Sequence, residues 1–321
     1  MYKKVFSKLA MITLMTVVMF AALFTGCGLR VGDNIKIDER NTSEFNSVSV
    51  EASLSNIELI EADNFGLEIF APKRFSPEWD ITNGHLTIRE KTTDFIFNLS
   101  ISSPRYYVKV YYPTGTVFNE VILRTSSGDI NVTRVDANDL DVFTSSGEIN
   151  ASAENFSNAS MKTSSGNIRF SGNGEYVDMN TSSGSIKSDI EGGDAIRATT
   201  SSGSISITGR GDAATALIAN TQSGNITANG VAWRDINTVA SSGDITINGA
   251  LLGNSYIKTS SGSLNITVDG DASQFGYSLT ASSGSIYWDG MKLAKPANSS
   301  GSFENNIDAT TSSGDIRVDF R

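Results

Sequence analysis

Apolar and polar residues alternate along most of the chain beyond residue 45, and the alternation recurs with a period close to 19 residues. The landmark of each period is the segment Thr-Ser-Ser-Gly or a close variant. Successive glycines are 19, 19, 18, 19, 21, 19, 19, 22 and 30 residues apart. A repeat of this length indicates one structural unit copied many times. The ten glycines are Gly128, Gly147, Gly166, Gly184, Gly203, Gly224, Gly243, Gly262, Gly284 and Gly314.

A large aliphatic residue stands two positions after every one of these glycines. Apolar residues also recur seven and five positions before the glycine, and threonine stands three before it in eight copies. This alternation predicts a strand with positions −7, −5, −3 and −1 facing inward, the serine at −1 included. The ten aliphatic residues are Ile130, Ile149, Ile168, Ile186, Ile205, Ile226, Ile245, Leu264, Ile286 and Ile316.

The alternation breaks between position −1 and position +2, so we expect a corner at the glycine. Glycine turns such a corner without a side-chain penalty. One unit cannot bury its own apolar face, so the units should stack into a parallel β-solenoid of about ten 19-residue coils. Its aliphatic residues would form one interior column. The inward hydroxyls need partners, most simply the backbone or the next hydroxyl of the stack.

Residues 45–120 alternate in the same way but lack clear copies of the corner, although Leu54-Ser55-Asn56-Ile57 is similar to a degenerate one. We expect irregular β coils and a cap here, because an uncovered strand edge invites aggregation. Residues 121–321 would then form the Ser-Ser-Gly repeat solenoid, and 45–321 one continuous domain.

The N-terminus has the features of a secretion signal. Three lysines precede an apolar run from Leu9 to Phe24 that is too short for a confident membrane span. The run ends at Leu23-Phe24-Thr25-Gly26-Cys27, which resembles the lipobox of bacterial lipoproteins. We expect a lipoprotein signal peptide over 1–26, acyl chains such as palmitate on Cys27 and a flexible tether over 27–44. An ordinary secretory signal with an incidental cysteine is the alternative.

Composition narrows the function classes. The formal net charge is −10, and removal of the signal peptide leaves 22 basic and 35 acidic residues, or −13. This balance argues against nucleic acid as a partner. One cysteine excludes a disulfide framework, and one histidine, His85, argues against a histidine-ligated metal site or a Ser-His-Asp triad. We expect no cofactor and no metal.

The segment Val121-Ile122-Leu123-Arg124-Thr125-Ser126-Ser127-Gly128-Asp129-Ile130, repeated to the end of the chain, resembles the DUF4097 family. These bacterial β-strand-repeat proteins are regarded as candidate adhesins. The resemblance covers roughly residues 45–321. It implies a right-handed parallel β-helix at the cell envelope and offers no catalytic residues. Some members are associated with envelope-stress regulation, which implies a second role.

Outward positions are where a ligand would be met. Basic and aromatic residues recur four before and three after the glycine, and a solenoid would align them into rows. Such rows would suit a cell-wall polymer, a host or neighbouring-cell surface or a partner protein. A solvated face that avoids like-charge stacking is the simpler interpretation. The residues are Arg124, Lys162, Arg169, Lys187, Lys258, Tyr287 and Arg317.

Four weaker candidates remain. Acids directly after the glycine, such as Asp129, suit calcium, but the glycine-aspartate repeat of calcium-binding β-rolls is missing. Arg210-Gly211-Asp212 resembles the integrin-binding tripeptide, and coincidence explains it better. The insertion at 289–308 is either a functional loop or a shield for the end of the stack. Aromatic residues that would stack on sugar rings are Trp79, Trp233, Trp288 and Tyr287.

These observations favour a non-enzymatic, lipid-anchored adhesin on the extracytoplasmic face of the cell membrane. The alternative is an accessory or sensor protein of the envelope-stress response that acts through a membrane regulator. A polysaccharide-active β-helix enzyme is a third, weaker hypothesis. It needs a break in the repeat where acids converge, whereas the repeat is most regular in its middle.

Overall fold

The computed structural model describes residues 34–91, 105–211 and 215–321. Within these ranges the secondary structure is β, apart from two single-turn 3₁₀ helices, and 25 strands join one hydrogen-bonded sheet. The same ranges contain no helix that is long and apolar enough to cross a bilayer. The predicted signal peptide and Cys27 lie outside the described residues.

The strands fall into three groups along the chain. Before the repeats stand β1 (Asn34–Arg40), β2 (Ser47–Glu51), β3 (Asn56–Ala62), β4 (Gly66–Pro72), η1 (Lys73–Phe75), β5 (Glu78–Thr82), β6 (His85–Arg89) and β7 (Tyr107–Pro113). The regular repeats comprise β8 (Val117–Thr125), β9 (Ile130–Thr144), β10 (Ile149–Thr163), β11 (Ile168–Thr181), β12 (Ile186–Glu191), β13 (Ala195–Ser202), β14 (Ile205–Gly209), β15 (Thr215–Ser223), β16 (Ile226–Ser242), β17 (Ile245–Leu252), β18 (Asn254–Ser261) and β19 (Leu264–Val268). The C-terminal part contains η2 (Ala272–Gln274), β20 (Phe275–Ser283), β21 (Ile286–Trp288), β22 (Met291–Leu293), β23 (Ala297–Asn298), β24 (Asn305–Ser313) and β25 (Ile316–Phe320).

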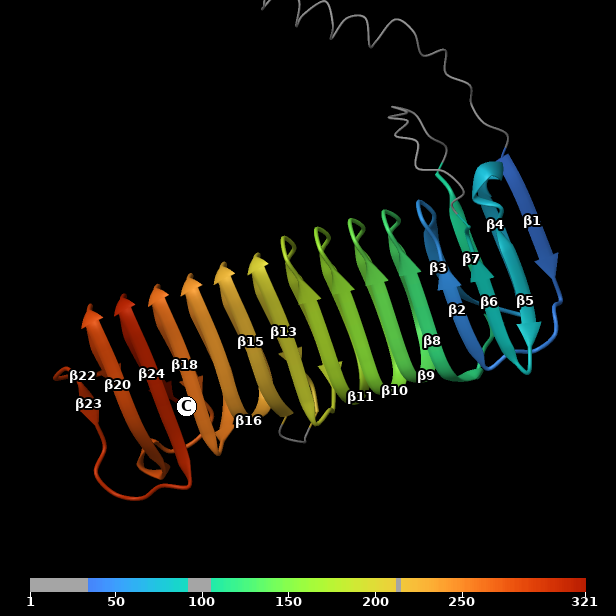
Figure 1. The fold of residues 1–321 in the computed structure, drawn as a ribbon. Helices are drawn as coiled ribbons and strands as arrows, with labels where there is room; N and C mark the ends of the chain where they lie inside the picture. Colours follow the sequence, from blue (N-terminus) through green and yellow to red (C-terminus); the bar gives the residue numbers. More distant parts are fainter. Residues whose placement is uncertain (1–33, 92–104, 212–214) are drawn as a thin grey trace, which may run out of the picture. The chain divides into compact units, whose positions relative to one another are not determined.

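The chain forms the expected β-solenoid. Strands that end at a corner pair in parallel with those of the neighbouring coils and make a front face, which Figure 1 shows toward the viewer. Strands that begin after a corner pair likewise and make a back face. Both faces turn their apolar residues into one continuous core.

The ten aliphatic residues after the glycines form one buried column. Each stands opposite its equivalent in the neighbouring coil, and none is more than 1% exposed. Ile57, after the degenerate corner, pairs with Ile130 and extends the column by one coil. Burial of each side chain contributes about 1.5–3 kcal/mol before chain entropy is subtracted.

The order of coils in space differs from their order in the sequence at both ends. The last strand pair of the chain, β24 and β25, lies between β18/β19 and β20/β21. Figure 1 shows red β24 between the orange strands β18 and β20. At the other end, β2 and β3 lie between the outer strands β6 and β7 and the inner strands β8 and β9. The pair β2 and β3 and the pair β24 and β25 are therefore each held between two neighbouring coils, while β6 and β7 at one end and β20 and β21 at the other form the outermost coils.

Antiparallel strands cover both outermost coils. At the N-terminal end β4 pairs with β7, β1 pairs with β4, and β5 pairs with β6. At the C-terminal end the insertion at 289–308 supplies β22 against β21 and β23 against β20. Lys295 of the same insertion donates to the carbonyl of Gly284, the outermost corner, at 2.8 Å. The insertion thus shields an edge that would otherwise remain open.

The predicted tether over 27–44 is wrong for its second half. Residues 34–40 form β1, and Ile37 stands opposite Ile69 of β4. The side chain of Ile37 packs against the core. A short amphipathic strand at the edge of a cap has too few apolar residues to be distinguished from a polar linker by composition.

The inward assignment of the serine at −1 is also wrong. All ten of these serines are exposed, because the inward alternation ends at the threonine of position −3. Serine backbones still pair between coils, as in the bond from Ser165 N to Ser145 O at 3.1 Å. The ten residues are Ser127, Ser146, Ser165, Ser183, Ser202, Ser223, Ser242, Ser261, Ser283 and Ser313.

The buried threonine at −3 joins neighbouring corners. Its hydroxyl donates to the glycine carbonyl of the adjoining coil, for example from Thr163 to Gly147 at 3.0 Å and from Thr259 to Gly243 at 2.9 Å. The glycine is required chiefly by close approach. A Cβ added at Gly147 would lie 1.9 Å from the carbonyl oxygen of Gly128, and the other corners are equally tight.

Candidate functional site

The seven residues predicted for a binding surface divide between the two faces of the solenoid. Arg124, Lys162 and Lys258 precede their glycines and lie on the front face. The other four follow their glycines and lie on the back face, so the seven do not form one surface. The back-face residues are Arg169, Lys187, Tyr287 and Arg317.

The back-face residues are separated or engaged locally. Arg169 donates to Glu148 at 3.0 Å, and the Arg317 guanidinium lies 4.8 Å from the centre of the Tyr287 ring. Hydrogen bonds from Asn167 and Arg169 lower the pKa of the Glu148 carboxyl below its ordinary value. Lys187 is exposed and has no ion pair within the described ranges. These contacts support the interpretation of this face as a solvated one.

The front face is hollowed beside two of the predicted residues. Arg124, Phe143 and Lys162 occupy position −4 of three successive coils, in register across β8, β9 and β10. With Glu51 of the first coil and other neighbours they line a depression of about 490 Å³. Arg124 donates to Asp141 at 2.7 Å, whereas Lys162 is exposed without an ion pair in the described part of the chain.

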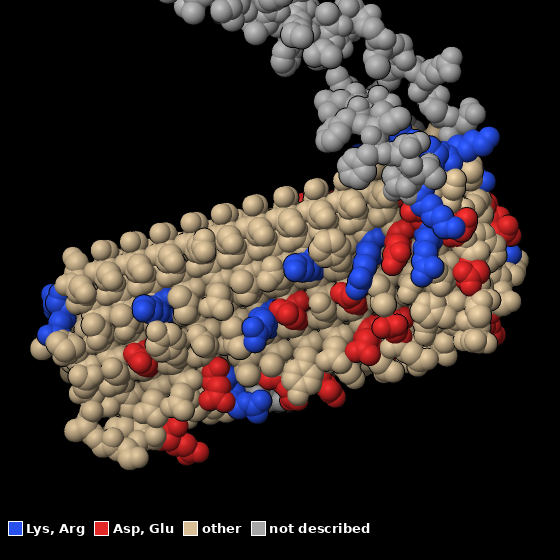
Figure 2. Space-filling view, viewed as in Figure 1, with Lys and Arg blue, Asp and Glu red and all other residues tan. Residues whose placement is uncertain are grey.

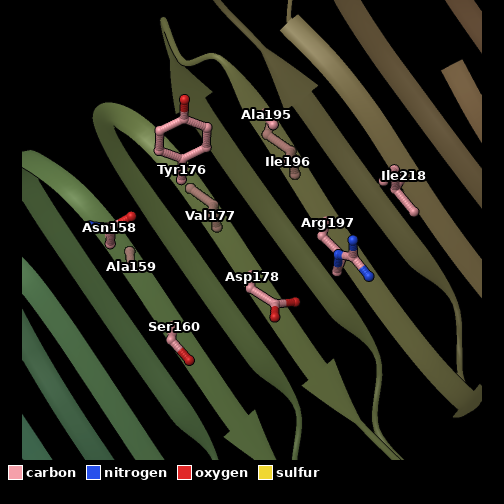
Figure 3. A pocket seen from close by; sticks show the side chains of 10 residues that line it. All are labelled: Asn158, Ala159, Ser160, Tyr176, Val177, Asp178, Ala195, Ile196, Arg197 and Ile218. Atoms are coloured by element: carbon pink, nitrogen blue, oxygen red, sulfur yellow. The ribbon is translucent and has the colours of Figure 1, made fainter. Parts of the chain in front are cut away.

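A second depression, of about 360 Å³, adjoins the first along the same face. Its lining includes Tyr176, Asp178 and Arg197, and Ser160 lines both depressions. Figure 3 shows Ser160, Asp178, Arg197 and Ile218 in line across neighbouring strands, with Tyr176 to one side. Tyr176, Asp178 and Arg197 were not predicted from the sequence, because only the residues at positions −4, +1 and +3 were compared as candidates for a binding surface. The row at position −6 was open to the same comparison.

Charged side chains are unevenly distributed over the front face. Figure 2 shows them concentrated near the N-terminal strands and sparse along the upper edge, where the Ser-rich corners lie. A separate charged group lies on β4 and β7, which extend the back face through β3, and centres on Glu68. Glu68 accepts from Tyr107 at 2.8 Å and lies 3.2 Å from Lys36. Burial alone would raise the pKa of Glu68, but the bonds from Tyr107 and Lys36 outweigh it and lower that pKa. The same carboxylate raises the pKa of Tyr107 to about 12.

The acids at position +1 serve the stacking of the coils. Asp129 Oδ1 accepts from the backbone N–H of Glu148 at 2.8 Å, and Asp244 Oδ1 accepts from Ser263 at 2.7 Å. Asparagine and serine at this position make equivalent bonds, for example from Ser185 N to Asn167 at 2.9 Å. Among the described residues no three Asp, Glu, His or Cys side chains are grouped as metal ligands. Hydrogen bonding to the next coil explains the preference for short acceptors at +1.

The aromatic residues predicted to stack on sugar rings are buried, partly buried or in contact with a neighbouring side chain. Trp233 is fully buried and donates to Asn248 O at 3.0 Å, and Trp288 is 7% exposed between Tyr277 and Phe320. Trp79 is half-buried against the core, and Tyr287 stacks with Arg317. Trp233 and Trp288 fill space in the core. The sequence alone does not distinguish such a core aromatic residue from one that is displayed on the surface.

The tripeptide at 210–212 is only partly described. Arg210 is exposed and forms an ion pair with Asp189. Asp212 lies outside the described residues. The arginine is therefore explained by a contact within the back face, and the integrin-like reading gains no support.

Several solved structures of bacterial proteins are similar to this chain at low sequence identity. A candidate adhesin from Bacteroides fragilis NCTC 9343 is 11% identical, with 89% of this chain and 97% of that chain covered and a TM-score of 0.36. A candidate lipid binding protein from Parabacteroides distasonis ATCC 8503 is 15% identical, covers 90% and 97%, and has a TM-score of 0.44. A candidate cell adhesion protein from Clostridium sporogenes ATCC 15579 is 9% identical, covers 89% and 100%, and has a TM-score of 0.25.

The comparison with curated proteins found no match. The family model of Toastrack DUF4097 matches residues 45–228 and 176–319. These two overlapping matches span both the irregular N-terminal coils and the Ser-Ser-Gly repeats, as the resemblance over residues 45–321 predicts. The chain therefore belongs to the Toastrack DUF4097 family.

Proposed function

We propose that this protein is a non-enzymatic adhesin of the bacterial cell envelope, lipid-anchored through Cys27, that displays side chains on its front face. The observation that carries the proposal is the pair of adjoining depressions on that face. Because the coils are stacked in register, each coil contributes its lining side chains to these depressions at a regular interval. Several weak contacts to one partner then act together, which raises the overall affinity without any strong single contact.

The sequence supports the location at the envelope. The apolar run, the lipobox-like segment and the chain's only cysteine coincide at residues 9–27. Two or three acyl chains anchor a protein stably, whereas one chain binds marginally. A body with a net charge of −13 has no general attraction to anionic lipid, so the anchor alone would hold it at the membrane.

The chemistry of the acids supports a binding role over catalysis. Where the structure engages these carboxylates, they accept backbone N–H groups or pair with arginine and lysine. His85, the single histidine, contacts Ser49 at 3.0 Å and is not among the residues that line either depression. The usual proton-transfer residue is thus not placed beside those depressions.

Two strains test the proposal: one without the gene and one with Cys27→Ser in the full chain. We expect the deletion to reduce attachment to a surface coated with cells of its own or a neighbouring species. We expect Cys27→Ser to move the protein from the membrane fraction to the soluble fraction and to reduce attachment equally. Unchanged attachment of the deletion strain contradicts the adhesin role. A response confined to an envelope-stress reporter contradicts it as well and favours the accessory role.

A further inference from the structure

The two front-face depressions form one trough that crosses seven successive coils, from β2 to β15. Its floor is the row at position −6, called here the central row, in which each residue stands opposite the next across the sheet. The two depressions meet at Ser160, the second residue of this row. The central row consists of Asp141, Ser160, Asp178, Arg197 and Ile218.

The central row offers hydrogen-bonding groups at a fixed interval. Neighbouring strands lie about 4.8 Å apart, so four polar side chains from Asp141 to Arg197 follow one another at that spacing. This interval is close to the length of one sugar unit in an extended glycan chain. A glycan lying across the strands would therefore meet a new donor or acceptor with each successive unit.

Asp178 and Arg197 keep their hydrogen-bonding capacity available. They stand directly opposite each other on β11 and β13. Yet neither side chain makes a hydrogen bond or ion pair with any described residue, although other arginines of the repeats, such as Arg124, are paired. Figure 3 shows both side chains projecting from the same face of the sheet. A carboxylate and a guanidinium so placed suit the hydroxyl and amide groups of a sugar.

Aromatic rings flank the central row on opposite sides. Phe143 lies at position −4 of one coil and Tyr176 at position −8 two coils further along. Tyr176 is 47% exposed. An aromatic ring beside a line of polar groups provides an apolar platform for the C–H face of a sugar ring.

The charge of the trough indicates an uncharged ligand. Its lining contains three acids, Glu51, Asp141 and Asp178, and three bases, Arg124, Lys162 and Arg197. The trough is therefore balanced, while the chain as a whole carries −10. A polyanion would be repelled by the body, and a polycation would find no surplus of acids in the trough.

From these observations we infer that the trough binds an uncharged, linear polysaccharide, which lies along the central row across its five coils. The inference rests on the proposed display role and specifies what is recognised. Contacts from consecutive sugar units add up, so the affinity should depend on the length of the glycan.

The probe is a series of β-1,4-linked N-acetylglucosamine oligomers from dimer to hexamer, titrated against the full chain purified in detergent. We expect the affinity to increase with each added unit up to five or six units. Tyr176→Ala and Arg197→Ala should each weaken hexamer binding about tenfold. Tyr176→Phe should retain most of the affinity, because it keeps the ring.

Arg321→Ala is the matched control, since this exposed arginine pairs with Asp269 away from the trough. We expect its hexamer affinity and the melting temperatures of all variants to equal those of the wild type. Absence of hexamer binding, affinity independent of length, or binding unaffected by Tyr176→Ala and Arg197→Ala would overturn the inference. If the deletion strain nevertheless loses attachment, only the ligand class fails and the proposed adhesin role stands.

Discussion

The early and late corners of the repeat share one sequence motif but differ in conformation. At Gly128, Gly147, Gly166 and Gly184 the glycine N–H donates to the threonine hydroxyl of its own corner at 3.1–3.3 Å. In the later corners, at Gly203, Gly224, Gly243, Gly262 and Gly314, it donates to a serine carbonyl of the next coil, at 2.8–3.2 Å. The φ angles of the late glycines from Gly224 to Gly314 lie between 107° and 157°.

This difference explains where the motif tolerates change. Early threonines both accept from the glycine and donate to the adjoining coil, so they satisfy two backbone groups. Late threonines only donate. The two copies with alanine at this position, Ala240 and Ala281, both belong to the late group. Identical residues therefore carry different hydrogen-bonding duties in the two regions, and the variation in sequence follows those duties.

The largest effect should come from the interior column, which both regions share. Ile205→Asp places an unpaired charge at a position that is 1% exposed. Such burial costs several kcal/mol, a large fraction of the stability of a domain. We expect loss of the cooperative transition in a circular-dichroism melt. Asn265→Asp, on the exposed back face, is the control and should melt as the wild type does. An unchanged melt of Ile205→Asp would contradict the inward column.

Glycine substitutions should affect both regions, and the late one more. A Cβ at Gly147 or Gly243 would lie 1.9 or 2.0 Å from a backbone carbonyl oxygen. Overpacking of this kind costs about 1–3 kcal/mol. Gly243→Ala adds the strain of a φ of 143°, about 1–3 kcal/mol more.

Urea unfolding of both alanine variants measures the difference. Gly115→Ala separates the two causes, because Gly115 has a φ of 80° but open space where the Cβ would stand. Its loss of stability should be smaller than that of either corner variant. Equal stability of Gly147→Ala and the wild type would show that the coils can move apart at no cost.

Threonine substitutions test the difference between the early and the late corners most directly. Thr163→Val leaves both the Gly166 N–H and the Gly147 carbonyl without their partner. Thr259→Val removes only the bond to the Gly243 carbonyl. An unsatisfied buried polar group costs about 1–3 kcal/mol, so the early variant should lose roughly twice as much stability in urea. A larger loss for Thr259→Val would mean that the two corner types are assigned the wrong way round.

The smallest effect concerns the pH dependence at one early corner. The pKa of Glu148 lies below its ordinary value of 4.5, because Asn167 and Arg169 donate to the carboxylate. A lowered pKa stabilises the fold above pH 4.5, and the contribution disappears as the pH falls through the folded-state pKa. Glu148 is partly exposed, so the change should not exceed about 0.5 kcal/mol.

Glu148→Gln should therefore lose less stability than the wild type between neutral pH and pH below 4.5. Glu304→Gln is the control, since Glu304 is exposed and makes no hydrogen bond with described residues. Melts of the three proteins at both pH values provide the measurement. Identical acid sensitivity of Glu148→Gln and the wild type would contradict the assigned hydrogen bonds.

The buried aliphatic column and the 19-residue period could be predicted, because an aliphatic residue stands two positions after every corner glycine. The exchanged order of the outer coils could not, because like coils with the same register fit beside one another in any order. Only the lengths of the connections hint at it. The steps of 22 and 30 residues before Gly284 and Gly314 occur where the chain passes over a coil and builds the cover with β22 and β23.

The exposure of the serines at −1 and the presence of the trough could not be predicted from the alternation of apolar and polar residues. The exposed serines at −1 continue the alternation on paper, but the chain already turns after the threonine. The trough depends on which outward rows lie next to each other, and on small residues such as Ala195 that leave space beside Tyr176. The spacing of residues along the chain does not show which rows become neighbours. That follows only from the stacked structure.

The structure at the two ends of the solenoid has a consequence for how this protein can vary. The N-terminal cap strands pair with one another and with β2 and β3, and β24 and β25 pair with their neighbouring coils at the other end, so both end structures are complete units that do not depend on how many copies separate them. Duplication or loss of a whole 19-residue copy in the middle changes the length of the array and leaves both ends intact. Gene rearrangement can thus change the length of the solenoid by whole coils, while the strands that cover its two ends stay the same.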